Sequence, residues 1–231
     1  MRTQIGTVPE ATAQIPMDEE QRRTLFMAAS LLLDYPDDAW GDKCAAVASA
    51  CGSLPVGVDK LLASYLDTAR EWGRREMEQH YVDIFDQRRR CSLFLSYYAV
   101  GDTRQRGAAI LAFKESLETL GFFLDREELP DHLCVVLEAA AKADGEAHAV
   151  ATDMLAAHRD GIEVLRLALE QAGSPYAPVV TAVCAALPAI DQATRDNFVE
   201  LIRQGPPAEL VGIGAPLPFP HTHADHTATN D

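Results

Sequence analysis

The stretch Glu127-Glu128-Leu129-Pro130-Asp131-His132-Leu133 lies between two apolar segments and has the composition of a helix start. Proline loses no hydrogen bond at the first helical position, because an N–H group there has no partner within the helix. Pro130 is therefore predicted at that position, with Asp131 and His132 in the first turn. The helix dipole stabilises a carboxylate there and opposes a charged imidazole. This acid and imidazole are also candidates for a binding site at the mouth of the helix.

Apolar residues recur at helical spacing on both sides of this stretch. Leu133, Val136, Leu137 and Ala140 follow it, and no proline interrupts residues 56–129 before it. No window shows strand alternation bounded by hairpin turns, and no repeat recurs at a fixed period. The sequence therefore predicts an all-α fold, with a single-domain helical bundle over residues 18–205. A disordered segment over 1–17 and a flexible tail with proline and histidine over 206–231 are expected to flank it.

Capping residues set the expected helix limits. Asp18 and the acids after it favour a helix start, and Thr103 is a candidate cap for a later one. Gly121 and Gly173 are expected just after helix ends, and Ser174-Pro175 as cap and first helical position. The predicted helices cover about residues 18–33, 40–50, stretches between 56 and 85, 103–121, 130–142, 145–173, 174–187 and 191–204.

The composition excludes several classes of protein. Hydrophobic residues make up 48% of the 231 residues, enough for a sizeable core. The net charge of −15 argues against a nucleic-acid partner and suits a basic peptide. No apolar run approaches the roughly 18 residues of a membrane span, and Met1–Thr7 carries no apolar signal region. We therefore expect a cytoplasmic protein without stable membrane association.

The five cysteines form no Cys-x-x-Cys pair, which favours reduced core cysteines over a disulfide framework or a zinc site. Two of them, seven residues apart, could share one helix face. The cysteines are Cys44, Cys51, Cys91, Cys134 and Cys184.

Motifs of common enzymes are missing from the chain. It contains no Gly-x-Gly-x-x-Gly, no Walker-type lysine loop, no Gly-x-Ser-x-Gly and no Glu-x-x-His. The histidines at 80, 132, 148 and 158 are predicted to be surface or hydrogen-bonded residues rather than ligands. His221, His223 and His226 could hold a metal ion loosely, the alternative being a solvated tail. No catalytic residue, no metal site and no cofactor of the chain's own is predicted.

Aromatic and apolar residues are dense beside acids in the middle of the chain. Each one alone suits a plain core. As a set, next to an irregular segment, they also suit a groove for an amphipathic helix. The residues are Tyr81, Phe85, Leu93, Tyr97 and Tyr98, flanking Asp83 and Asp86.

Three blocks of sequence resemble the NarJ family of respiratory nitrate reductase assembly chaperones, in the order expected of it. They are His80-Tyr81-Val82-Asp83-Ile84-Phe85-Asp86 with Arg90-x-Ser92-Leu93, Gly101-Asp102-Thr103-Arg104-x-Arg106-Gly107, and Glu128-Leu129-Pro130-Asp131-His132-Leu133. Leu31-Leu32-Leu33-Asp34-Tyr35-Pro36 is similar to the end of the family's first helix. The resemblance covers about residues 24–205. Gln87-Arg88-Arg89-Arg90-Cys91 replaces the proline-rich loop of related branches and is more basic than the family pattern.

The resemblance implies an all-helical, non-enzymatic chaperone of the molybdoenzyme maturation type. Such a protein would bind the immature catalytic (alpha) subunit of nitrate reductase through its N-terminal segment. It would hold that subunit until its molybdenum cofactor and iron–sulfur centres are in place, and would delay its docking to the membrane subunit. The chaperone need not hold the cofactor itself.

We therefore expect a cytoplasmic assembly chaperone that recognises its client by a helix-in-groove contact. Alternatives are a chaperone of another molybdoenzyme, a helical adaptor, or a small helical enzyme or metal-binding protein. The candidate peptide-binding residues are Tyr81, Asp83, Phe85, Asp86, Leu93, Tyr97, Tyr98, Arg104, Asp131, His132, Leu133 and Leu137.

Overall fold

The computed structural model describes residues 10–124, 128–188, 191, 196 and 199–201. Within these residues there is no strand, and one isolated bridge pairs Phe94 with His132. The predicted all-α fold is confirmed. The α-helices are α1 (Glu19–Leu32), α2 (Trp40–Ala50), α3 (Val56–Trp72), α4 (Arg74–Tyr81), α5 (Leu95–Val100), α6 (Arg106–Thr119), α7 (Leu133–Lys142), α8 (Gly145–Ala157), α9 (Arg159–Gln171) and α10 (Ala177–Ala186). Short 3₁₀ turns form η1 (Cys51–Ser53) and η3 (Arg89–Cys91), and a π-helical turn forms η2 (Val82–Asp86).

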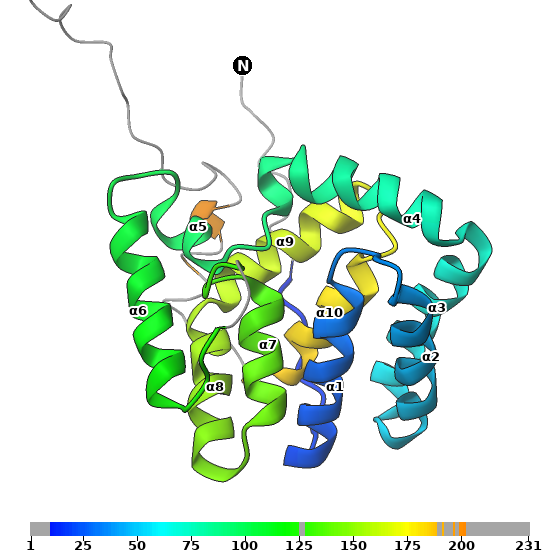
Figure 1. The fold of residues 1–231 in the computed structure, drawn as a ribbon, viewed down its shortest axis with the longest axis horizontal. Helices are drawn as coiled ribbons and strands as arrows, with labels where there is room; N and C mark the ends of the chain where they lie inside the picture. The colour runs from blue at the N-terminus through cyan, green and yellow to red at the C-terminus, as the bar shows by residue number, and fades with distance from the viewer. Residues whose placement is uncertain (1–9, 125–127, 189–190, 192–195, 197–198, 202–231) are drawn as a thin grey trace, which may run out of the picture.

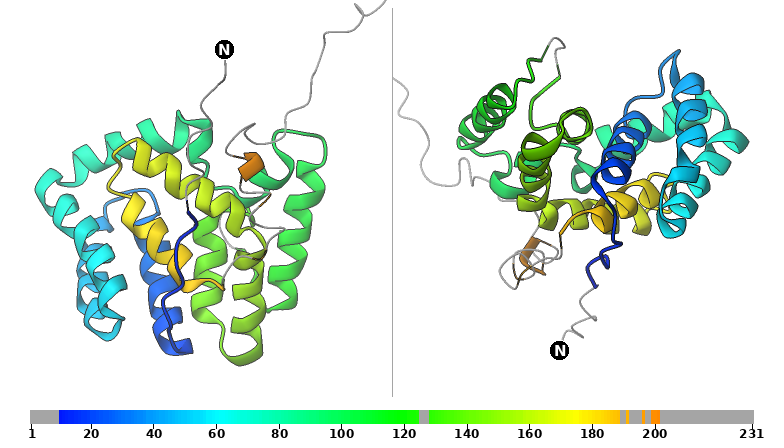
Figure 2. Two further views of the ribbon diagram at one scale, coloured as in Figure 1. Left: turned by 180° about the vertical axis from the view of Figure 1, so that it is seen from behind. Right: turned by 90° about the horizontal axis from the view of Figure 1, so that it is seen from below.

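Helix α1 lies at the centre of the bundle. It packs against α7 on one side and α2 on the other, with α10 behind it (Figure 1). Helix α10 also packs against α3 and α9, so it joins the two halves of the molecule. Seen from below, α6 and α7 stand at one end and α2 and α3 at the other (Figure 2). One outer face of α1 remains uncovered between α2 and α7.

The first helix begins where the sequence predicts. Asp18 is the N-cap of α1, and its carboxylate accepts a hydrogen bond of 2.8 Å from the Gln21 N–H. The Gln21 side chain accepts one in return from the Asp18 N–H, which completes a capping box. Between α3 and α4 the chain breaks at Gly73, whose φ of 73° favours glycine over residues with a side chain.

The start of α7 differs from the prediction. The helix begins at Leu133, and Pro130 and Asp131 form a turn before it. The Leu133 N–H donates to Leu93 O at 2.8 Å, and the Leu95 N–H donates to Asp131 O at 2.9 Å. Because this pairing with residues 93–95 needs an extended backbone, His132 takes φ −68° and ψ 132° instead of a helical conformation.

Three further helix limits also differ from expectation. The helix predicted over 145–173 is divided into α8 and α9 at His158, where φ is −111°. Helix α6 begins at Arg106, because Thr103 caps a preceding turn by accepting a hydrogen bond from the Gln105 N–H. Helix α10 begins at Ala177, and Ser174 likewise accepts from the Tyr176 N–H in the turn before it.

Residues 10–17, here called the N-terminal strap, are docked on the fold rather than disordered. The Thr12 N–H donates to Glu163 Oε1 at 2.8 Å, and Arg159 Nη2 donates to Thr12 O at 2.7 Å. The Ile15 N–H donates to Ala185 O at 2.8 Å. The strap therefore runs along α9 and α10, as the dark blue segment in Figure 2 shows. Residues 1–9, most of the helix predicted over 191–204, and the predicted tail over 206–231 lie outside the described residues.

Candidate functional site

Asp131 and His132 hold the entry to α7. Asp131 is fully buried, and its Oδ2 accepts a hydrogen bond of 2.5 Å from the Ser96 hydroxyl. His132 is 7% exposed and packs edge-on against the ring of Phe94. Among the described residues neither Asp131 Oδ1 nor His132 Nδ1 has a hydrogen-bond partner. Leu133 and Leu137 are fully buried in the core beneath them.

The predicted aromatic site residues are core residues in this conformation. Tyr81 and Phe85 pack together at 4.7 Å between ring centroids, and both contact Tyr176. Tyr97 packs against Tyr98, and the Tyr98 hydroxyl donates to Ser92 O at 2.8 Å. These four side chains and Leu93 are buried or half-buried, so none of them presents an open aromatic surface.

The charged members of the predicted set lie on the surface. Asp83 and Asp86 are exposed on η2, and Arg104 is exposed in the turn before α6. Tyr81, which directly precedes η2, contacts the segment after α1, because its ring packs edge-on against Tyr35. Burial raises the pKa of Tyr81, and the charges of Asp34, Asp86 and Glu128 raise it further. These three acids come from separate segments, and all of them lie near Tyr81.

A surface groove lies between α1 and α7, and we call it the α1–α7 groove. Its volume is about 520 Å³, and its outer wall is formed by Phe122, Phe123, Leu124 and Glu128 from the connection between α6 and α7. Of the twelve predicted site residues, only His132 lines it. Its lining consists of Met27, Ser30, Leu31, Asp34, Asp37, Ala39, Lys43, Leu117, Phe122, Phe123, Leu124, Glu128, His132, Cys134, Val135, Glu138, Ala139 and Lys142.

Apolar side chains are open to solvent in the α1–α7 groove. Met27 and Leu31 are half-buried on the outer face of α1, one helical turn apart. Phe123 is 75% exposed and Leu124 is 38% exposed on the wall. Side chains of this kind on the surface indicate a place where another apolar surface binds.

The two ends of the α1–α7 groove carry different charge. Ser30 donates to Cys134 O at 2.9 Å and Arg23 donates to Ala141 O at 3.0 Å, so α1 and α7 run antiparallel. The C-terminal end of α1 therefore lies beside the start of α7, and Asp34 and Glu128 meet there. The opposite end holds Glu138 and Lys142, which form an ion pair, and Arg23 lies next to it.

Lys43 compensates part of the acidic end. Its Nζ lies 2.8 Å from Asp34 and 3.1 Å from Asp37. Burial lowers the pKa of Lys43, but these two hydrogen bonds outweigh burial and raise the pKa above its ordinary value. One lysine shared by two carboxylates, with Glu128 close by, leaves this end of the groove negative.

Imidazole protonation is disfavoured at the same end. Burial lowers the pKa of His132, although Glu128, Asp34 and Asp131 act in the opposite direction. His132 is therefore neutral near pH 7 and adds no positive charge to the groove.

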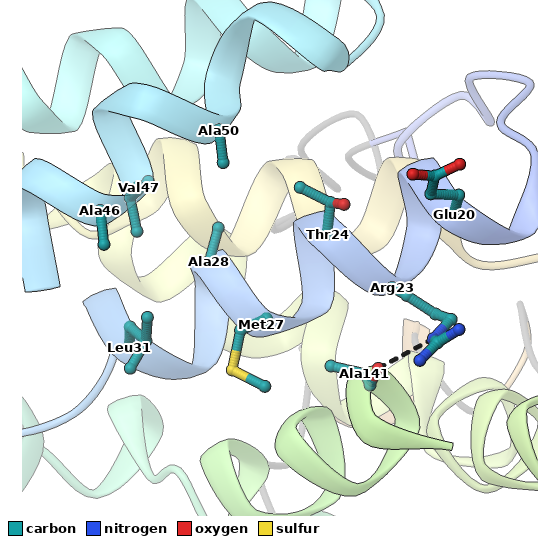
Figure 3. Close-up of a pocket in the computed structure, with 10 residues that line it drawn as sticks. All are labelled: Glu20, Arg23, Thr24, Met27, Ala28, Leu31, Ala46, Val47, Ala50 and Ala141. Carbon is teal, nitrogen blue, oxygen red and sulfur yellow. Dashed lines mark hydrogen bonds between the residues drawn. The ribbon is translucent and has the colours of Figure 1, made fainter. Parts of the chain in front are cut away.

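A second hollow of about 460 Å³ lies on the other side of α1, against α2. Figure 3 shows Ala46, Val47 and Ala50 of α2 facing Thr24 and Ala28 across it. Met27 and Leu31 belong to both hollows, so the apolar surface continues across α1. The periodicity of apolar residues did not identify Met27 and Leu31 as surface residues, because they continue the apolar pattern of the core face of α1.

The remaining histidines and the cysteines have structural contacts. His80 is bonded to Ser174, His148 to Ala140 O and His158 to Met154 O, as expected of hydrogen-bonded histidines. All five cysteines are free thiols, and burial raises the pKa of Cys44 to about 11. The described part of the chain contains no group of three or more metal-ligating side chains, and His221, His223 and His226 lie outside it. None of the helices in the described ranges is long and apolar enough to cross a membrane.

The fold and the groove define an all-helical protein whose candidate site is an open surface groove. Residues 52–182 match the model of the nitrate reductase delta subunit family, and the chain belongs to that family. It is 31% identical over 174 residues to the probable nitrate reductase molybdenum cofactor assembly chaperone NarJ of Bacillus subtilis, covering 74% of this chain and 92% of that protein.

Two other relatives match over smaller shares of their length. The nitrate reductase molybdenum cofactor assembly chaperone NarJ of Escherichia coli K12 is 31% identical over 120 residues, 51% of each chain. The nitrate reductase-like protein NarX of Mycobacterium tuberculosis is 34% identical over 170 residues, which are 74% of this chain and 25% of that protein. The family predicted from the three sequence blocks is confirmed.

Proposed function

We propose that this protein is a cytoplasmic assembly chaperone for respiratory nitrate reductase. It binds the N-terminal segment of the immature catalytic subunit, supports insertion of the molybdenum cofactor and delays docking to the membrane subunit. Membership of the family and the names of the relatives support the chaperone role. The observation that carries the binding mode is the α1–α7 groove, with its apolar floor and acidic end.

The groove has the chemistry that an amphipathic basic helix needs. The apolar stripe of such a helix would cover Met27, Leu31 and Phe123, removing their side chains from water. Its basic residues would be attracted to Asp34, Asp37 and Glu128. Attraction between surface charges raises the association rate more than the affinity, and salt weakens it.

The predicted site residues have two roles in this proposal: one borders the groove, and the buried ones position α7. His132 borders the acidic end directly. The buried members, among them Asp131, Leu133 and Leu137, hold α7 in the position that forms one wall. Their contribution to binding is therefore to the shape of the groove.

Calorimetry with a synthetic peptide tests the proposal. The peptide is the N-terminal segment of the cognate catalytic subunit, and binding should show a negative ΔCp from apolar burial. Phe123→Ser should weaken binding about tenfold, since it removes an aromatic contact worth about 1.5 kcal/mol. Leu111→Ser is the matched control, because Leu111 is 52% exposed on α6 and does not line the groove. Equal losses in the two variants, or no heat with the wild-type protein, would contradict groove binding.

The chaperone role itself is measured in cells. A strain that lacks the chain should accumulate catalytic subunit without molybdenum cofactor, and the wild-type chain should restore the cofactor content. Phe123→Ser should restore it less well than Leu111→Ser at equal protein level. Full maturation without the chain would rule the role out.

A further inference from the structure

The two ends of the α1–α7 groove differ in charge, and a bound helix would interact differently with each end. Acids from two segments line the end formed by the C-terminus of α1 and the start of α7: Asp34 and Asp37 follow α1, and Glu128 precedes α7. At the other end the charges of Glu138 and Lys142 cancel in an ion pair. The field along the groove therefore runs from negative to neutral, while the apolar floor between the ends is unchanged.

A helix carries the opposite asymmetry. Its N-terminal end has a partial positive charge from unpaired N–H groups, and its C-terminal end has a partial negative charge. A chain that begins near that helix adds the positive charge of its α-amino group. The distance from Arg23 to Asp34 along α1 corresponds to about 16 Å, enough for a helix of about 11 residues.

We propose that the α1–α7 groove binds the client helix in one direction only, with the N-terminal end beside Asp34 and Glu128 and the C-terminal end beside Lys142. This inference rests on the proposed function and adds the orientation of the client and the feature that sets it. The recognised partner is an amphipathic helix whose positive charge lies at its N-terminal end. A helix with that charge at its C-terminal end is disfavoured by the same field.

Paramagnetic labelling tests the direction. The probe is the N-terminal peptide of the cognate catalytic subunit, with a nitroxide on its first or its last residue, added to the full-length chain labelled with ¹⁵N. The first label should broaden the amide signals of Leu33 and Asp34, and the last label those of Lys142 and Arg23. The reverse pattern, or equal broadening of both ends by each label, overturns the orientation while leaving the proposed function intact. Absence of any binding overturns both.

A charge cycle tests the cause of the orientation. Acetylation of the peptide's α-amino group and Glu128→Gln each remove one partner of the proposed attraction. Each change alone should weaken binding about two- to fivefold at low salt, and the second change should add little after the first. Glu138→Gln is the control at the other end of the groove. Acetylation of the peptide should weaken binding to this variant as much as it weakens binding to the wild type. Independent, additive effects of acetylation and Glu128→Gln would overturn the proposed pairing.

Discussion

Asp131 is fully buried, and its carboxylate accepts a hydrogen bond from Ser96. Asp131→Ala should lower the free energy of unfolding by about 1–3 kcal/mol, because the Ser96 hydroxyl would be buried without a partner. Urea denaturation of Asp131→Ala, Ser96→Ala and the double variant measures this. The double variant should lose less than the sum of the single losses, since the residues share one interaction. Additive losses would show that the hydrogen bond contributes nothing.

His132 should make stability depend on pH. Burial lowers its pKa in the folded protein below the ordinary value of 6.5. The unfolded chain therefore binds more protons between those two pKa values, so the free energy of unfolding falls as pH falls below 6.5. This contribution is complete above pH 6.5. Denaturation from pH 7.5 to 5.5 should show a shallower decline for His132→Gln than for the wild type.

Burial also lowers the pKa of His80, which should produce a decline of the same sign in both proteins. The difference between wild type and His132→Gln removes this background. Parallel pH profiles would mean that His132 does not titrate differently in the folded and unfolded states.

At the scale of single residues, the sequence predicted which residues lie on an apolar helix face better than it predicted what that face contacts. Leu133 and Leu137 were placed correctly on one helical face, because periodicity depends only on spacing. Periodicity does not distinguish a face that meets the core from one that meets a client, since both require apolar residues. The exposed Phe123 was missed for a related reason: it lies in a connection, where no period applies.

Helix α9 carries a buried charge network that the strap completes. Glu163 is fully buried, and Arg166 Nε donates to its carboxylate at 2.7 Å. Arg159 Nη2 lies 3.6 Å from the same carboxylate. The strap adds two hydrogen bonds from Thr12 to Glu163. One carboxylate thus balances two buried guanidinium groups and holds the strap.

Glu163→Gln should lower the free energy of unfolding by about 3–5 kcal/mol, because it removes the buried counter-charge of both arginines and leaves Arg166 only the half-exposed Glu170. Glu170→Gln is the control. Glu170 also bonds Arg166, but its side chain is 46% exposed, so the expected loss is below about 1 kcal/mol. Urea denaturation of both variants measures the difference. Similar losses would show that the buried network contributes no more than a surface ion pair.

Helix existence followed from local sequence, whereas several helix limits depended on distant contacts. The start of α7 is displaced by pairing with residues 93–95, which lie far away in the chain. The break between α8 and α9 at His158 carries neither glycine nor proline. Close packing orients α9 there, because a side chain on Gly161 would come within 2.6 Å of Tyr98 Cβ. Local propensity does not encode contacts of this kind.

At the scale of the whole molecule, deletion of residues 206–231 should leave the fold and peptide binding intact. The residues that form the groove and those that match the family model all precede residue 206. The melting temperature and the peptide affinity of the truncated protein should equal those of the full chain. A soluble truncated protein that fails to mature nitrate reductase would assign a role to the tail.

The all-α architecture and the family were predicted from the sequence, but the location of the groove was not. Its walls come from α1, α2, α6, α7 and the connection before α7, which meet only after folding. The acids at 34 and 128 are nearly a hundred residues apart in the chain. No local pattern relates them.

The strap has a consequence for the order of events during synthesis. Thr12 and Glu163 are 151 residues apart, so the strap leaves the ribosome long before its partner. At a translation rate of about 5–20 residues per second, the delay is roughly 8–30 s. Arg159 also donates to Leu187 O at 2.8 Å, beyond the end of α10. The first and last parts of the described bundle are therefore joined through one side chain, and the strap reaches its final place only after the chain through residue 187 has emerged.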